Sequence, residues 1–199
     1  MDVYWRLKPN VRLFFIAART KETGQSTETE FGMHVDIFVK RLVKLKRVAG
    51  LHIDESKESP LLLRAGYRVV ASSGNTTEHR FVFEGTPRLP LKVGSVVSIR
   101  NRLELRFQDG FSWRYRNRAM VEREFAIGSY HITPYVRGEF YYDSKPAKWS
   151  RTATTAGCVF PIRKRAELEA YFEHQNDTAG SRNRQINAVG VALSLHFQK

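Results

Sequence analysis

Hydrophobic and polar residues alternate with a period of two along almost the whole chain. In the stretch SIRNRLELRF (98–107), every second residue from Ser98 to Arg106 is polar or charged, and the residues between are mostly apolar. A period of two is typical of extended strands with two different faces. The pattern predicts eleven strands and no helix of useful length. The predicted strands span 3–8, 11–19, 28–40, 60–70, 78–88, 95–107, 111–125, 130–142, 149–161, 165–175 and 184–197.

The connections between these strands are of two kinds that alternate along the chain. One kind is polar and fairly long, as in TKETGQST (20–27) and NDTAGSRN (176–183), and the other is short, as in KPN (8–10) and AIGS (126–129). Short turns at one end and longer loops at the other are typical of an up-and-down meander that closes into a barrel. We therefore predict one all-β domain over 1–199, an up-and-down antiparallel transmembrane β-barrel of about 10–12 strands.

The parity of the strands raises a question about closure. If the last strand descends toward the short-turn end, segment 3–8 descends as well, and two descending strands cannot pair antiparallel. Either an ascending strand precedes Met1, giving twelve strands, or 3–8 lies outside the barrel, giving ten. Segment 41–59 either continues the third strand or forms its own hairpin. Its basic cluster is expected to be solvated, with a phosphate contact as the alternative: Lys40, Arg41, Lys44, Lys46 and Arg47.

Alternation alone does not say which face points inward, because a soluble barrel and an outer-membrane barrel share the pattern. Three features favour apolar side chains outward and charged side chains in the lumen. The polar face mixes arginine and carboxylates at high density, the strands are longer than the ~5–6 residues of soluble sheets, and aromatic residues gather near strand ends. The residues predicted to line the lumen are Arg64, Arg68, Arg80, Glu84, Arg100, Arg102, Glu104, Arg106, Arg114, Arg116, Arg118, Glu122, Arg137, Glu139, Glu167, Glu169 and Glu173.

Composition narrows the choice of partners. The net charge of +13 and pI of about 10.1 point to anionic partners. Arginines interleaved with aromatics also suit a nucleic-acid surface, but glutamates share the arginine face and the aromatics lie mainly on the other, so we expect no nucleic-acid partner. The single cysteine excludes an intrachain disulfide, no cofactor is expected, and no apolar run reaches the ~20 residues of a membrane helix.

Several segments together resemble an uncharacterised outer-membrane β-barrel family, domain of unknown function 2490. The resemblance runs from about residue 3 to the C-terminus and lies in the combination of RNRLELR (100–106), RYRNR (114–118), the TPY…FYYD segment (133–143) and the last strand. It implies a monomeric outer-membrane barrel in contact with lipid and lipopolysaccharide. The ending LSLHF (193–197) resembles the last strands read by the barrel assembly machinery. Such proteins need secretion, and no signal peptide is visible, so we expect Met1 to be an artificial or misassigned start.

The resemblance implies no activity, so function has to be weighed from the residues. A dense arginine and glutamate face predicts either a lumen plugged by ion pairs or a narrow, anion-leaning pore. The alternative is an outer-membrane lipid-modifying hydrolase, which requires a nucleophile, a base and an acid close together in space. His79 lies near Ser72, Ser73 and Glu78 in the sequence, and His174 lies near Asp177, but neither group forms a recognisable motif. No catalytic residue and no metal ligand is assigned.

Overall fold

The computed structural model describes residues 1–21, 27–39, 59–91, 95–128, 130–163, 165–180 and 183–198. Each of the eleven predicted strands is present, and a short additional strand, β8, follows the seventh. The strands are β1 (Asp2–Lys8), β2 (Val11–Thr20), β3 (Glu28–Val39), β4 (Leu61–Ser72), β5 (Glu78–Pro90), β6 (Ser95–Phe107), β7 (Phe111–Arg123), β8 (Phe125–Ile127), β9 (Tyr130–Asp143), β10 (Lys148–Arg163), β11 (Ala166–Asp177) and β12 (Arg184–Gln198). Within these ranges no helix is long and apolar enough to cross a membrane.

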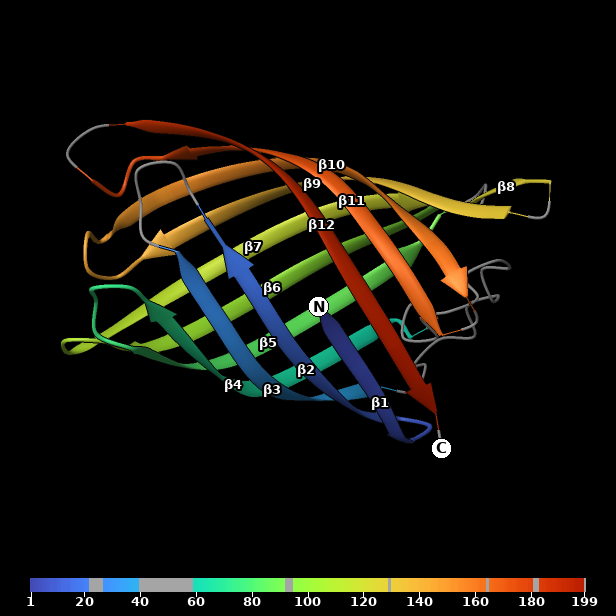
Figure 1. Ribbon diagram of the computed structural model, residues 1–199, viewed down its shortest axis with the longest axis horizontal. Helices are drawn as coiled ribbons and strands as arrows, with labels where there is room; N and C mark the ends of the chain where they lie inside the picture. Colours follow the sequence, from blue (N-terminus) through green and yellow to red (C-terminus); the bar gives the residue numbers. More distant parts are fainter. Residues whose placement is uncertain are drawn as a thin grey trace.

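Eleven strands close into a barrel, and β8 extends one end of it by pairing only with β9 (Figure 1). Neighbours in the sequence are antiparallel neighbours in the wall, apart from β7, which pairs with β9. The predicted β-barrel is therefore confirmed. The basic cluster within 41–59, like Lys40, lies outside the described residues, as does all of that segment except Ser59.

The barrel closes in a way that the strand parity did not predict. Residues Asp2–Arg6 of β1 pair in parallel with Ser194–Gln198 of β12, and β1 also pairs antiparallel with β2 (Figure 1). The prediction that 3–8 might lie outside the barrel is wrong, because β1 is part of the wall. A parallel pair needs no strand of opposite direction between its members, although its slanted hydrogen bonds are slightly weaker than antiparallel ones.

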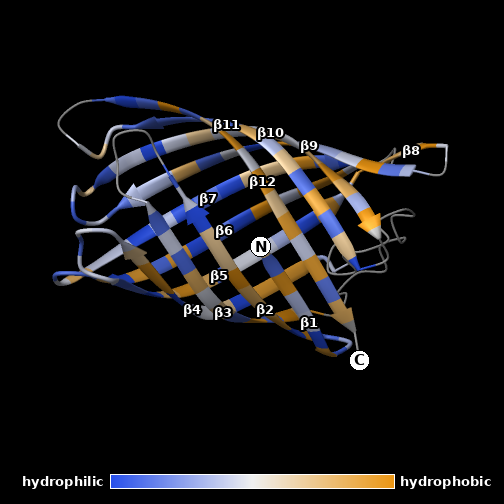
Figure 2. Ribbon diagram, in the orientation of Figure 1, coloured by the Kyte–Doolittle hydropathy of each residue, from blue (hydrophilic) through white to orange (hydrophobic). Residues whose placement is uncertain are grey.

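The burial of β3 shows which face points inward. Phe31 and Met33 are 59% and 55% exposed, whereas His34 and Asp36, which follow them on the other parity, are 1% and 0% exposed. The side chains that a closed wall hides are those that point into the lumen, so the polar parity faces inward. Figure 2 shows hydrophilic and hydrophobic residues alternating along the other strands. The barrel thus carries its charged residues inside and most of its large apolar residues outside.

A row of stacked rings crosses the parallel seam on the inner face; we call it the aromatic row. It consists of His196 on β12, Tyr4 on β1, Phe14 on β2 and His34 on β3, which are successive register partners. Their ring centroids lie 4.9, 4.7 and 5.1 Å apart in that order. Because each such pair contributes about 0.5–1.5 kcal/mol beyond its buried area, the row reinforces the part of the wall where backbone pairing is weakest.

The aromatic row ends at Gly66 of β4, the register partner of His34. The imidazole of His34 lies against this glycine, and a Cβ built at Gly66 would overlap the ring and lie 2.5 Å from the Met33 carbonyl oxygen. Glycine is therefore required here by a close approach between strands. By contrast, a Cβ at Gly138 on the outer face of β9 would meet nothing within 4 Å.

We expect Gly66→Ala to destabilise the refolded barrel by about 1–3 kcal/mol, the usual cost of overpacking, because backbone cannot move away as a side chain can. Guanidinium unfolding in detergent measures the effect, with Gly138→Ala as the matched control expected to stay near wild type. Equal unfolding midpoints for the two variants would contradict the placement of the His34 ring.

Candidate functional site

The most densely bonded part of the lumen is a group of ion pairs on the inner wall of β5, β6, β7 and β9. We call it the central lattice; its members are Glu84, Arg100, Arg102, Glu104, Arg116, Arg118 and Glu139. Glu139 accepts hydrogen bonds from Arg100 Nη2 at 2.6 Å, from Arg116 Nε at 3.0 Å and from Arg118 Nη2 at 2.8 Å. Its side chain is only 4% exposed. One carboxylate therefore neutralises guanidinium groups from two neighbouring strands.

The other two carboxylates of the lattice extend it across β5, β6 and β7. Arg102 donates to Glu84 Oε2 from Nε at 2.9 Å and from Nη2 at 2.7 Å. Glu104 accepts from Arg116 Nη1 at 3.0 Å, and Arg102 Nη1 lies 3.6 Å from it. Charge-assisted bonds of this kind are stronger than neutral ones. The arginines and carboxylates thus form one connected network instead of isolated pairs.

The strand register explains why the lattice needs its carboxylates. Arg100 lies directly opposite Arg118, and Arg102 lies directly opposite Arg116. Like charges that face each other across two strands are destabilising. A glutamate beside each such pair converts the repulsion into a shared attraction, so the pattern of glutamates among the arginines is a condition for closing this wall.

A second cluster surrounds Asp36, whose side chain is fully buried. Arg12 donates to Asp36 Oδ2 from Nη2 at 2.7 Å, and Arg64 donates to Oδ1 from Nε at 2.6 Å. The Arg12 guanidinium lies 4.2 Å from the ring centre of Tyr4, and that of Arg64 lies 4.1 Å from the ring centre of Phe14. Cation–π contacts of this kind gain strength when they are desolvated. The cluster ties the aromatic row to the charged wall.

All residues predicted to line the lumen lie on the inner parity of their strands and are buried or half-buried. The structure does not join them into one network, however. The β11 carboxylates have looser ion pairs: Arg137 lies 3.6 Å from both Glu169 and Glu173, and Glu167 faces His196 at 3.1 Å. Their closer partners are the neutral hydroxyl groups of Tyr135, which donates to Glu169, and Thr155, which donates to Glu173. Their side chains are also more exposed, at 26% for Glu169 and 25% for Glu173.

Sequence reasoning missed several inner residues that carry ion pairs: Arg12, Glu30, Asp36, Glu78 and Asp143. Arg12 could not be recognised as an inner residue because segment 11–19 is apolar on both faces. Glu78 and Asp143 were missed because they stand at strand ends next to loops. Parity could have found these two, since Glu78 is in phase with Arg80, and Asp143 is in phase with Glu139.

The structure separates the residues considered for a hydrolase. His79 points outward, where it contacts the Tyr67 hydroxyl, whereas Glu78 points inward to Arg80 and Arg106. His174 contacts Asn187 on the outer face, whereas Asp177 pairs with Arg151 on the inner side. Neither histidine is therefore brought together with its neighbouring carboxylate. Among the described residues, no three His, Cys, Asp or Glu side chains are placed to hold a metal ion.

A polar cavity of about 310 Å³ opens at the long-loop end of the barrel; we call it the vestibule. Its lining residues are Thr20, Glu28, Val70, Asn75, Glu78, Arg80, Arg106, Gln108, Arg114, Arg151, Asp177 and Arg184. Glu78 accepts from Arg106 Nη2 at 2.7 Å and also from Arg80, and Arg114 Nε donates to Asp143 at 2.7 Å. Guanidinium groups outnumber carboxylates in the lining, so the vestibule has a cationic excess.

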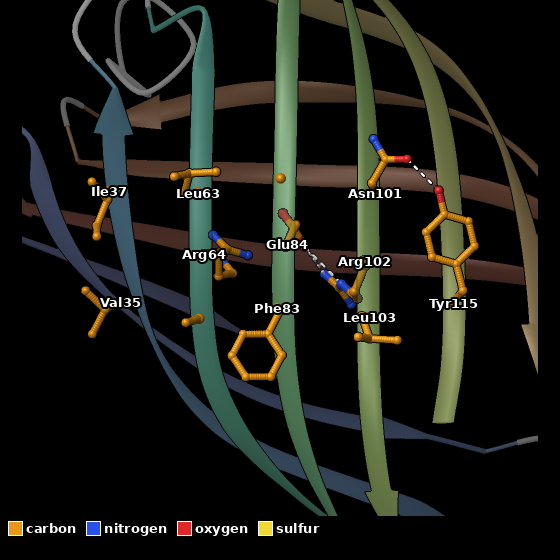
Figure 3. A pocket seen from close by; sticks show the side chains of 12 residues that line it. Val35, Ile37, Leu63, Arg64, Phe83, Glu84, Asn101, Arg102, Leu103 and Tyr115 are labelled. Carbon is orange, nitrogen blue, oxygen red and sulfur yellow. Dashed lines mark hydrogen bonds and ion pairs between the residues drawn. The ribbon is translucent and has the colours of Figure 1, made fainter. Parts of the chain in front are cut away.

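The outer wall carries a different kind of hollow. An apolar groove of about 450 Å³ lies over β3–β7, lined by Val35, Ile37, Leu63, Phe83, Leu103 and Tyr115 (Figure 3). Two of its lining residues bring polar groups that bond to each other: Asn101 Oδ1 accepts from Tyr115 Oη at 2.6 Å, and it also accepts from Asn117 Nδ2 at 2.8 Å. In the same view Glu84 and Arg102 bond to each other on the lumen side of these strands.

Removing the most connected carboxylate tests the central lattice. We expect Glu139→Gln to lower the free energy of unfolding by about 3–5 kcal/mol, because Arg100, Arg116 and Arg118 would share a neutral amide in a buried site. Guanidinium unfolding of the refolded barrel measures it. Glu28→Gln is the matched control, since Glu28 is exposed and forms no ion pair with the described residues, and it should stay within about 0.5 kcal/mol of wild type. A similar small change for Glu139→Gln would show that the lattice is not stabilising.

Comparison with known proteins supplies a family and no activity. No curated protein matches the chain. The family model described as "Protein of unknown function (DUF2490)" matches residues 50–186, which include β4–β11 and all of the central lattice. The match leaves out β1–β3 and most of β12, and so both strands of the parallel seam, β1 and β12. Because it spans more than half of the chain, this protein belongs to the DUF2490 family.

Proposed function

We propose that this protein is an integral β-barrel of the bacterial outer membrane. The observation that carries the proposal is the inverted distribution of side chains: aliphatic and aromatic residues cover the outside, and arginines and carboxylates fill the inside. A water-soluble barrel of the same sequence would leave a wide apolar surface in water. In a bilayer that apolar surface contacts the hydrocarbon of the lipids, and the charged side chains stay inside the lumen.

The aromatic residues at one end of the barrel and the few polar residues on its outer face support the same proposal. At the long-loop end, Trp113, Tyr142 and Trp149 form outward ring contacts at 5.5 and 5.6 Å, as expected for an interfacial aromatic girdle. The outward amides of Asn101 and Asn117 bond to each other, which lowers the cost of placing them against lipid. Under this proposal the partners are outer-membrane lipid, lipopolysaccharide and the barrel assembly machinery, and the barrel acts as a monomer without a cofactor.

The role that the lumen supports best is passive. His34, Asp36 and Glu104 are at most 1% exposed and the arginines of the central lattice at most 19%, so little water reaches the wall at the Asp36 cluster or the central lattice. A lumen filled in this way suits a structural barrel that passes few ions. The cationic excess of the vestibule gives the residual current an anion preference, because arginines lower the barrier to anions.

Two adjacent residues of β12 test the orientation in the bilayer. Val189 points outward and is 84% exposed, whereas Ala188 points inward. In a Cys158→Ala background reconstituted into liposomes, we expect a fluorophore on Val189→Cys to be quenched by lipid-borne spin labels at least about threefold more than one on Ala188→Cys, because only the former meets hydrocarbon. Equal quenching at both positions would refute a bilayer location for the outer face.

Ion selectivity tests the passive role. We expect the reconstituted barrel to give only small currents in planar bilayers, with a preference for anions. Arg137→Gln should move the reversal potential toward the value for a cation-selective barrel, since it removes an inward charge. The contacts it loses are modest: two ion pairs at 3.6 Å and cation–π contacts at 5.4 Å with the rings of Tyr135 and Tyr171. Arg19→Gln removes an exposed charge of β2 that points outward, so it should leave selectivity unchanged. A cation-selective wild-type barrel would argue against the assignment.

A further inference from the structure

We propose that the vestibule is a binding site for a small phosphorylated sugar. The inference goes beyond the passive role proposed above and does not depend on it, because binding at this cavity needs a folded barrel but no bilayer and no current. It rests on three features of the lining: unused guanidinium donors, neutral polar groups at the rim, and carboxylates placed among them.

Two arginines of the vestibule, Arg80 and Arg151, use only part of their guanidinium donors in bonds to the described residues. Arg80 bonds to Glu78 through Nε alone, and Arg151 bonds to Asp177 through Nη2 alone, at 2.5 Å. A guanidinium has five N–H donors, so each of these arginines retains donors that no described residue of the chain accepts. Both side chains are held by their carboxylates and line the same cavity. Arginines that are preoriented in this way suit bidentate binding of phosphate.

The rest of the lining suits hydroxyl groups better than a bare anion. Thr20, Asn75 and Gln108 contribute neutral donors and acceptors, and Glu28 is a carboxylate that forms no ion pair with the described residues. A free carboxylate repels a naked oxyanion but accepts hydrogen bonds from sugar hydroxyls. A ligand with a phosphate at one end and hydroxyls at the other satisfies both halves of the lining.

The size of the vestibule limits the ligand. Its volume of about 310 Å³ lies at the lower end of the ~300–1,000 Å³ usual for small-molecule sites, which fits a monosaccharide phosphate and not an oligosaccharide. The cavity faces the barrel axis and is walled off from the outer face by the strands. The ligand class is therefore a water-soluble sugar phosphate, and the phosphorylated headgroup of a glycolipid would have to bend over the rim to reach the same arginines.

Calorimetric titration of the full chain, refolded in detergent, tests the proposal with glucose 6-phosphate as the probe. We expect saturable binding that weakens as salt is raised. Arg80→Gln and Arg151→Gln should each weaken it at least about tenfold. Glu78 retains Arg106 in the first variant, so the barrel should still fold. Asn75→Ala, a loop change that removes a rim amide, gives a second test and should weaken binding of the sugar phosphate but not of inorganic phosphate.

The controls decide between the outcomes. Arg19→Gln removes one exposed, outward positive charge at the end of β2 that borders the vestibule, and this variant should bind glucose 6-phosphate like wild type. Absence of saturable binding, equal binding of glucose, or unchanged affinity in both arginine variants would overturn the proposal. Binding of inorganic phosphate as tight as that of glucose 6-phosphate would also overturn it, because the sugar would then contribute nothing. In nanodiscs, competition by a phosphoinositide in the lipid would assign the site to a headgroup, and its absence supports the soluble ligand.

Discussion

The structure depends on one constraint: the charges that point into a closed barrel have to neutralise one another. Guanidinium groups taken out of water without partners cost several kcal/mol each, and opposed arginines on neighbouring strands add repulsion. Glu84, Glu104 and Glu139 relieve both costs because each contacts arginines from more than one position of the wall. The central lattice is thus required for the barrel to close, whether or not its charges also act on ions in the lumen.

The seam between the first and last strands shows how the barrel manages its least-bonded region. β1 pairs with β12 only through Asp2–Arg6, which lie opposite Ser194–Gln198. Within the described residues, the earlier part of β12, Arg184–Leu193, pairs with β11 alone. The aromatic row crosses the seam at Tyr4, which stacks on His196 and Phe14, and Arg12 covers Tyr4 while bonding to Asp36. Side chains inside the lumen therefore join strands that the backbone joins weakly.

Much of this architecture could be predicted from the sequence, because parity is a local property. The alternation in β3–β7 fixes both the strands and their inward residues, and each predicted strand appears within a few residues of its expected ends. Parallel closure could not be predicted, since it depends on where residues 2–6 meet 194–198 across the whole chain. The Asp36 cluster was missed because Arg12 stands in a strand that is apolar on both faces. The vestibule could not be predicted either, because its lining residues come mostly from the ends of strands that meet only after closure.

The positions of the charges along the axis bear on how much the lumen can conduct. The vestibule at the long-loop end has an excess of guanidinium groups, whereas Glu167 and Glu169 stand toward the other end of β11. Glu169 and Glu173 of β11, at 26% and 25%, are also more exposed than the arginines of the central lattice, which are at most 19% exposed, so water in the lumen meets these glutamates first. An anion favoured at the mouth is repelled further along, and a cation meets the opposite sequence. Fixed charges of opposite sign in series raise a barrier to ions of either sign, which favours a structural barrel with a ligand site at its mouth over an open pore.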